Sequence, residues 1–154
     1  SSDISGLIGQ YAHGNEPSHH IVHLYNYVNQ SWKTQQLIDT ILHTQYFNNP
    51  NGLSGNEDCG QMSAWYVLNA MGFYQVCPGS PIYSVGRPIF DKVTINLPNG
   101  KVFEIIANNN SRTNKYIQSI RLDNILLESP FFMHSDIMKG GKIVMEMGNT
   151  PVKQ

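Results

Sequence analysis

The sequence predicts an α+β fold in which the helices come first and the β-strands follow. Apolar residues recur with helical spacing up to about residue 78, and after Pro78-Gly79 they alternate with a period of two. The chain of 154 residues is long enough to bury a substantial core. We therefore expect a helical segment over residues 1–78 and a β-rich, antiparallel segment over residues 79–154.

The first helix is expected to begin at Pro17 and to run to about Asn29. Proline suits the first turn of a helix because its missing N–H would have no partner there. The spacing of four apolar residues predicts one buried helical face: Ile21, Leu24, Tyr25 and Val28.

The second helix is expected to begin at Ser31, a residue type that caps helix N-termini. Turn-forming residues end it at 48–52, where the sequence reads Asn-Asn-Pro-Asn-Gly. Its apolar stripe consists of Trp32, Ile38, Ile41, Leu42 and Tyr46.

The third helix is expected to follow Asp58. Asp58 is a good N-cap, and Gln61 three positions later completes the pattern of a capping box. Trp65 starts the predicted inner face, and Gly72 is a natural stop at the C-terminal end.

The second half of the chain carries strand and hairpin patterns. Pro98-Asn99-Gly100 separates two alternating runs, at 92–97 and 101–106, which predicts a hairpin. A short helical turn is expected at 134–139. Further strands are expected at 116–122, 125–127 and 142–147.

The composition narrows the classes of ligand. The net charge is -1, the pI is about 6.6, and no run of basic residues is present, so we expect no nucleic-acid partner. A chain with only 14% charged residues and many Asn, Ser, Tyr and Gln suits neutral ligands such as sugars. No apolar segment approaches the ~20 residues that a membrane span needs. No signal peptide is visible, and a start at Ser1 leads us to expect processing or truncation.

Two acid-bearing loops each precede a predicted helix. One contains Glu57 and Asp58 between Gly55 and Gly60, and the other spans residues 13–17. Glycine lets backbone approach a ligand closely, and a carboxylate held at such a point can act as a general base or a metal ligand. We expect the two loops to converge on one site, although Asp58 as a simple N-cap remains an alternative.

The second loop carries Asn15 and Glu16, whose oxygens are of the kind that calcium prefers. Three histidines follow at His19, His20 and His23. The spacing of His19 and His23 is typical of paired zinc ligands on a helix, but no third ligand is evident. Hydrogen bonding near a polar pocket is therefore the preferred role for these histidines, and a zinc-dependent hydrolase stays as an alternative.

Five stretches of the chain resemble a known family. They are residues 11–20, 55–66, 71–74, 78–83 and 134–137, with Gly140-Gly141 near the end. Nearly the whole chain is similar to the C-terminal part of the family-92 glycoside hydrolases, which are calcium-dependent exo-acting α-mannosidases. The resemblance implies the last helices of an (α/α)6 toroid, followed by a β-rich tail.

The resemblance also implies roles for individual residues. Asn15 and Glu16 would hold calcium, which binds two hydroxyls of the terminal mannose. The family acts with inversion, so Asp58, with Glu57 as second candidate, would be the base that activates water. His13, His19 and Gln61 are the substrate-binding candidates implied by the resemblance.

Two departures from the family pattern carry consequences. No stretch here matches the earlier toroid segment that supplies the general acid, so we expect this segment alone to be inactive. Ala12-His13 stands where members selective for α-1,2 bonds carry His-Glu, which leaves the linkage open.

The resulting hypothesis is the C-terminal segment of a periplasmic or secreted bacterial α-mannosidase. Its expected partners are a mannose-containing glycan and the rest of the same polypeptide, including an N-terminal β-sandwich and the earlier toroid helices. The alternative is a non-catalytic carbohydrate-binding module built from residues 79–154.

Overall fold

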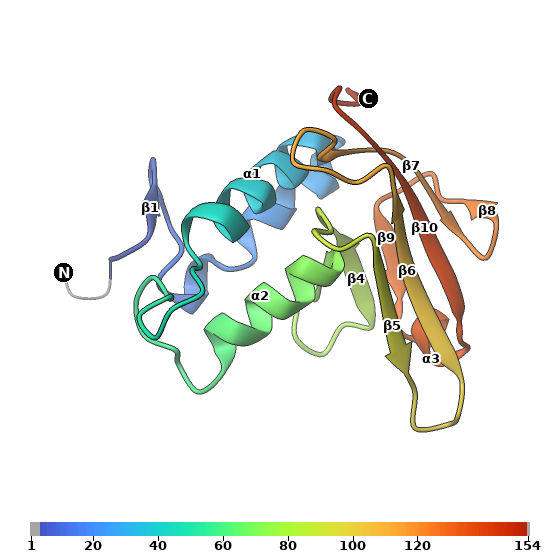
Figure 1. Ribbon diagram of the computed structural model, residues 1–154, viewed down its shortest axis with the longest axis horizontal. Helices are drawn as coiled ribbons and strands as arrows, with labels where there is room; N and C mark the ends of the chain where they lie inside the picture. The colour runs from blue at the N-terminus through green and yellow to red at the C-terminus, as the bar shows by residue number, and fades with distance from the viewer. Residues whose placement is uncertain (1–3, 154) are drawn as a thin grey trace.

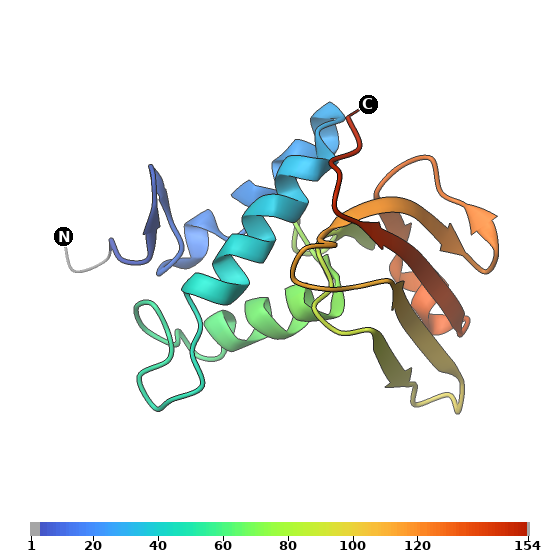
Figure 2. The same ribbon diagram turned by 45° about the horizontal axis from the view of Figure 1, so that its top comes forward.

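The computed structural model describes residues 4–153; residues 1–3 and 154, at the outer ends of the two predicted segments, lie outside it. The long helices lie on one side of the molecule and the larger sheet on the other (Figure 1). Turning the molecule shows the same two-part arrangement, with the N-terminal hairpin at the end of the helical part that faces away from the sheets (Figure 2). The predicted α+β class is confirmed.

The helical part contains short strands as well as helices. Its elements are β1 (Leu7–Ile8), β2 (Tyr11–Ala12), η1 (Glu16–Ser18), η2 (Ile21–Val28), α1 (Ser31–Thr44), α2 (Gln61–Met71) and β3 (Phe73–Tyr74). The β-rich part consists of β4 (Ile82–Val85), β5 (Lys92–Asn96), β6 (Val102–Asn108), β7 (Tyr116–Leu122), β8 (Ile125–Leu126), β9 (Phe131–Met133), α3 (His134–Met138) and β10 (Gly141–Gly148).

The strands form three sheets. The largest has the order β5-β6-β10-β7-β8, the second has the order β3-β4-β9, and β1 pairs with β2. All of these pairs are antiparallel except β6 with β10. The predicted antiparallel character of the β part is therefore confirmed, and β6 with β10 is its one parallel pair among the described strands. Because β6 and β7 run in opposite directions, a strand inserted between them must be parallel to one of the two.

The predicted hairpin and the strong strands are confirmed. β7 spans the predicted residues 116–122, β5 and β6 pair across the turn at 98–100, and α3 lies within 134–139. The strands β3, β4 and β9 escaped prediction because they are only two to four residues long. β3 pairs with β4 across residue 78, and the segment boundary proposed there stays a prediction.

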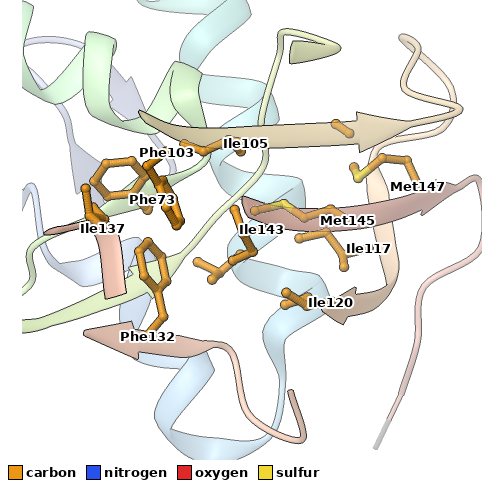
Figure 3. Close-up of a cluster of buried hydrophobic side chains, with 12 residues drawn as sticks. Phe73, Phe103, Ile105, Ile117, Ile120, Phe132, Ile137, Ile143, Met145 and Met147 are labelled. Atoms are coloured by element: carbon orange, nitrogen blue, oxygen red, sulfur yellow. The ribbon is translucent and has the colours of Figure 1, made fainter. Parts of the chain in front are cut away.

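Two apolar clusters stabilise the fold. The first lies between the two larger sheets, where aromatic side chains of the smaller sheet meet aliphatic ones of the larger sheet (Figure 3). Its fully or nearly buried members include Phe73, Phe103, Ile105, Phe132, Ile143 and Met145. The second lies between the helices and consists of Val22, Ile38, Ile41, Leu42 and Trp65. The predicted inner faces of α1 and α2 are thus confirmed in Ile38, Ile41, Leu42 and Trp65.

The buried face predicted for the first helix is wrong. The segment forms two 3₁₀ helices, and Ile21, Leu24 and Val28 are 41%, 43% and 59% exposed. The face that packs inward carries Val22, His23 and Asn26 instead. Polar residues take the inner face because partners for their hydrogen bonds come from distant parts of the chain.

His23 and Asn26 connect η2 to strand β4, and His23 also connects it to helix α2. His23 contacts the Ser84 hydroxyl through Nδ1 at 3.0 Å and Asn69 Oδ1 through Nε2 at 2.8 Å. Asn26 donates to Ser84 Oγ at 2.7 Å and to the Val85 carbonyl at 2.8 Å. Since Asn69 Oδ1 can only accept, Nε2 carries the proton of a neutral His23 and Nδ1 accepts from Ser84.

This histidine makes the stability depend on pH. Burial lowers the pKa of His23 to about 4, partly opposed by its hydrogen bond to Asn69. The unfolded chain, with an ordinary pKa near 6.5, therefore binds a proton first as pH falls. The contribution of His23 is full above about pH 6.5 and declines down to about pH 4, by roughly 3 kcal/mol in all.

We expect the wild-type protein to lose more unfolding free energy between pH 7 and pH 4.5 than a His23→Gln variant, whose amide cannot titrate. Urea unfolding at both pH values measures the two losses. Equal losses would show that His23 is not the source of this pH dependence.

A buried ion pair also joins the two parts. Asp39 of α1 lies 2.9 Å from Arg87 Nε, and both side chains are buried. The Arg87 guanidinium also contacts the loop after β6, where it donates to Asn110 Oδ1 and to the Ser111 carbonyl. Helix α1 is thereby fixed to the β part. Within residues 4–153 no helix has the length and apolar character needed to cross a membrane.

Candidate functional site

The two acid-bearing loops meet at the N-terminal ends of η1 and α2. A Cβ placed on Gly55 would lie 2.6 Å from the Gly14 carbonyl oxygen, so the two backbones touch. Gly55 also has a φ of +94°, which favours glycine. This close approach requires Gly55 and Gly14, and it produces the convergence of the two loops that the sequence predicts.

Between the loops lies an open, polar hollow of about 160 Å³. We call it the acidic hollow, and it is lined by Ser5, Gly14, Asn15, Glu16, Gly55, Asn56 and Asp58. No lysine or arginine within residues 4–153 forms an ion pair with Glu16 or Asp58. The hollow is therefore a site of negative charge without a cationic partner in the described part of the chain.

Asn15 and Glu16 present oxygen atoms at the start of η1. Asn15 is in an extended conformation, and its Oδ1 accepts a hydrogen bond from the Glu16 backbone N–H at 3.2 Å. Pro17 follows in the first turn, as predicted. Glu16 is exposed. An amide oxygen and a carboxylate side by side are hard donors of the kind that calcium binds.

The loop before α2 has an unusual backbone. Asp58, Cys59 and Gly60 have φ values of 53°, 55° and 98°, so three successive residues are left-handed. Only glycine adopts this region readily, and an aspartate or cysteine there is uncommon. A strained stretch of this kind points to a functional constraint on where the Asp58 side chain is directed.

The expectation that Asp58 caps α2 is wrong. The N-cap position is Gly60, which forms no side-chain cap, so the predicted capping box of Asp58 with Gln61 is absent. Glu57 supplies the carboxylate instead: its Oε1 accepts from the Ser63 backbone N–H at 3.0 Å. Hydrogen bonding from Ser63, first from its hydroxyl and then from its N–H, lowers the pKa of Glu57. The left-handed turn separates the two acids: Glu57 serves the helix, and Asp58 lines the hollow.

His13 lies behind the hollow and is fully buried. Tyr46 donates its hydroxyl hydrogen to the Met62 carbonyl at 3.0 Å, so His13 Nε2 must donate to the Tyr46 oxygen at 2.7 Å. His13 Nδ1 then accepts from the Tyr11 hydroxyl at 2.9 Å. Burial, and secondarily the nearby His19, lower the pKa of His13 to about 3, so it is neutral at pH 7.

His19 is 1% exposed and is likewise engaged at both ring nitrogens. Its Nε2 lies 3.0 Å from the His13 carbonyl oxygen, and its Nδ1 lies 2.9 Å from Gln61 Nε2. Neither His13 nor His19 lines the hollow, and their expected contacts with substrate stay a prediction. Gln61 is half-buried, with its amide directed to His19 and to the Tyr74 hydroxyl.

Among the described residues, no arrangement of side chains supports the zinc alternative. His19 and His23 each use both ring nitrogens on protein partners. Within residues 4–153, no three His, Cys, Asp or Glu side chains are grouped so that they could hold a metal ion. A calcium ion in the acidic hollow would therefore take only part of its six to eight oxygen ligands from this segment.

A second, larger hollow of about 440 Å³ lies between the segment that follows α1 and helix α2. It is lined mainly by aromatic and aliphatic residues: Tyr46, Phe47, Asn48, Gly52, Leu53, Ser63, Tyr66 and Val67. No carboxylate or histidine lines it, so it lacks the side chains that a glycosidase uses as acid or base, despite its larger volume. The acidic hollow, although smaller, is the candidate catalytic site, and its acids all come from residues before 79.

Sequence reasoning missed the side chains that support the hollow. Tyr11 and Tyr46 hydrogen-bond to His13, Tyr74 accepts from Gln61, and Trp65 Nε1 donates to the His19 carbonyl at 2.9 Å. Trp65 shows the helical spacing of a core residue, which hides its second role as a donor. No local signal identifies the role of Tyr46, because its partner His13 lies 33 residues away in the sequence.

Comparisons with known proteins give one family. The family model described as the catalytic domain of glycosyl hydrolase family 92 matches residues 1–149. An uncharacterized secreted glycosidase from Arthroderma benhamiae is 27% identical over 138 residues, which are 88% of this chain and 18% of that protein.

Two solved structures from Bacteroides thetaiotaomicron are similar over nearly the whole chain. A family GH92 α-mannosidase in complex with mannoimidazole is 44% identical, with a TM-score of 0.93, over 97% of this chain and 20% of its own. A family GH92 inverting mannosidase is 43% identical, with a TM-score of 0.87, over 93% of this chain and 19% of its own. The chain thus spans about a fifth of the length of these relatives.

Proposed function

Since this chain belongs to glycosyl hydrolase family 92, we propose that it is the C-terminal part of an inverting exo-α-mannosidase that releases terminal α-linked mannose from glycans. The similarity to α-mannosidases at 43% and 44% identity supports the choice of sugar. The relatives are about five times longer, so the remaining catalytic groups belong to the rest of the polypeptide.

One observation carries the assignment of the base. Of the two neighbouring acids, only Asp58 lines the acidic hollow, while the Glu57 carboxylate is held by the N–H of Ser63. Within residues 4–153 the Asp58 carboxylate has no ion-pair partner, so it is available to accept a proton from water. Asp58 is therefore the general base, which takes that proton as the water attacks the anomeric carbon.

Calcium is the proposed cofactor, with Asn15 and Glu16 as the residues of this chain that hold it. The donor set fits: the Asn15 amide oxygen and the Glu16 carboxylate line one hollow, and no cation among the described residues pairs with Glu16. When bound, calcium would orient two neighbouring hydroxyls of the terminal mannose. The chain's own contribution is to fix the Asn15–Glu16 turn against the Asp58 turn.

The general acid is proposed to lie outside this chain. Inverting enzymes use two carboxyl groups about 6.5–9.5 Å apart, one as base and one as acid. The carboxylates that line the hollow, Glu16 and Asp58, are assigned to calcium and to the base. The segment alone is accordingly expected to be inactive, and a periplasmic or secreted bacterial location is proposed, in line with the secreted relative.

The stereochemistry of the product tests this function. The full-length protein incubated with an α-linked mannobioside is expected to release β-mannose first, as seen by proton NMR, whereas residues 1–154 alone release none. Initial release of α-mannose would contradict the inverting assignment. Turnover by the isolated segment would contradict the external general acid.

A further inference from the structure

The fully buried side chain of His19 joins the two turns of the acidic hollow, beside Tyr46, which links His13 to the Met62 carbonyl. His19 contacts the His13 carbonyl, which directly precedes Gly14 and Asn15. On its other side it contacts Gln61, the first residue of α2 and the third after Asp58. No other side chain within residues 4–153 has hydrogen bonds to both residue 13 and residue 61.

The directions of these two hydrogen bonds follow from their partners. A carbonyl oxygen only accepts, so the proton of the neutral imidazole lies on Nε2 and points to the His13 carbonyl. Nδ1 then carries the lone pair, which accepts a hydrogen of the Gln61 amide at 2.9 Å. His19 thus donates one hydrogen bond to the first turn and accepts one from the residue that follows the second turn.

His19 is held in place through its backbone and through its ring. Trp65 Nε1 donates to the His19 backbone carbonyl at 2.9 Å. The His13 and His19 rings stack with centroids 4.8 Å apart, and the Trp65 ring packs edge-on against His13 at 4.4 Å. A side chain that is buried, stacked and bonded on both sides cannot adapt to a shift of either turn, and so it transmits a fixed spacing.

We propose that His19 is a positioning residue that sets the distance between the calcium-holding turn at Asn15–Glu16 and the base Asp58. The proposal rests on the function assigned above. In it, His19 does not contact the substrate itself but holds the two turns that bind calcium and carry the base. Misplacement of a catalytic group by about 1 Å can lower a rate by about 100-fold, so a rigid bridge of this kind has a measurable effect.

His19→Phe in the full-length protein tests the proposal. Phenylalanine keeps the ring but loses both hydrogen bonds to the turns. We expect the calcium Kd, measured by isothermal titration calorimetry, to rise about tenfold or more, which corresponds to about 1.4 kcal/mol. The kcat at saturating calcium is expected to fall between about 10-fold and 100-fold.

His23→Phe is the matched control. His23 is equally buried and also makes two hydrogen bonds, but to Asn69 and Ser84, away from the hollow. Both variants are expected to have a lower melting temperature, whereas only His19→Phe changes the calcium Kd and kcat. Equal changes in both variants, or an unchanged calcium Kd in His19→Phe, would overturn the proposal.

A smaller substitution covers the case in which His19→Phe does not fold. His19→Asn keeps a polar atom near the position of Nδ1 but cannot reach the His13 carbonyl, so the same rise in calcium Kd is expected at smaller size. A wild-type calcium Kd in this variant would contradict the proposal that His19 sets the spacing of the two turns. If the wild-type protein binds no calcium or releases no mannose, the proposed function fails instead, and the two failures are distinguished.

Discussion

Replacement of Asp58 by asparagine in the full-length enzyme is expected to lower kcat by at least about 100-fold, equivalent to about 2.7 kcal/mol of transition-state stabilisation. Asparagine has nearly the same shape but cannot accept a proton from water. It also tolerates the left-handed backbone at this position, where φ is 53°. The melting temperature is therefore expected to stay close to that of the wild type.

Glu57→Gln provides the matched control for this prediction. The substitution removes the neighbouring negative charge, but the glutamine oxygen can still accept the hydrogen bond from Ser63. Its kcat is expected to fall by less than about tenfold. Steady-state kinetics on a mannoside measures both variants. A large loss in Glu57→Gln with near-normal turnover in Asp58→Asn would exchange the roles of the two acids.

The sequence predicted regular elements where local patterns are strong. The alternating runs around Pro98-Asn99-Gly100 form the hairpin β5–β6, and the apolar stripe of α1 is buried at Ile38, Ile41 and Leu42. These patterns depend only on residues within a few positions of one another. Local chemistry is sufficient for them.

Prediction failed where distant partners decide the structure. Helix η2 buries His23 and Asn26 rather than Leu24, because Ser84 of β4 supplies a partner to both from about 60 residues away. Strand β10 lies between β6 and β7, and its parallel pairing with β6 depends on the directions of strands that precede it. Neither choice is visible in a local pattern.

The candidate site shows the same division. The position of two acid-bearing loops before two predicted helices indicated one shared site, and the structure brings these loops together at Gly14 and Gly55. The division of labour between Glu57 and Asp58 depends on three left-handed residues, of which only Gly60 is recognisable in the sequence. The burial of His13 and His19 depends on Tyr46, Gln61 and Trp65, which pack against them from later helices and loops.

Removal of calcium is expected to abolish mannose release, and return of calcium is expected to restore it. The physical reason lies in the acidic hollow, where Glu16 and Asp58 have no cationic partner within residues 4–153 and where oxygen donors suit a hard cation. The fold of α1 and of the β part depends on the two apolar clusters and not on the hollow, so the circular dichroism spectrum is expected to stay the same after chelation. Activity that is indifferent to chelation would refute the proposed cofactor.

The central claim is that the metal and the base share one hollow. The most direct test is the free calcium concentration that gives half-maximal turnover in the full-length enzyme. Glu16→Gln is expected to raise this concentration at least about tenfold, because it removes one charged oxygen ligand. Glu57→Gln is the control, because it makes the same change of charge in a residue that does not line the hollow. Its calcium concentration for half-maximal turnover is expected to stay within about twofold of the wild-type value. Identical calcium curves for Glu16→Gln and the wild type would contradict the account.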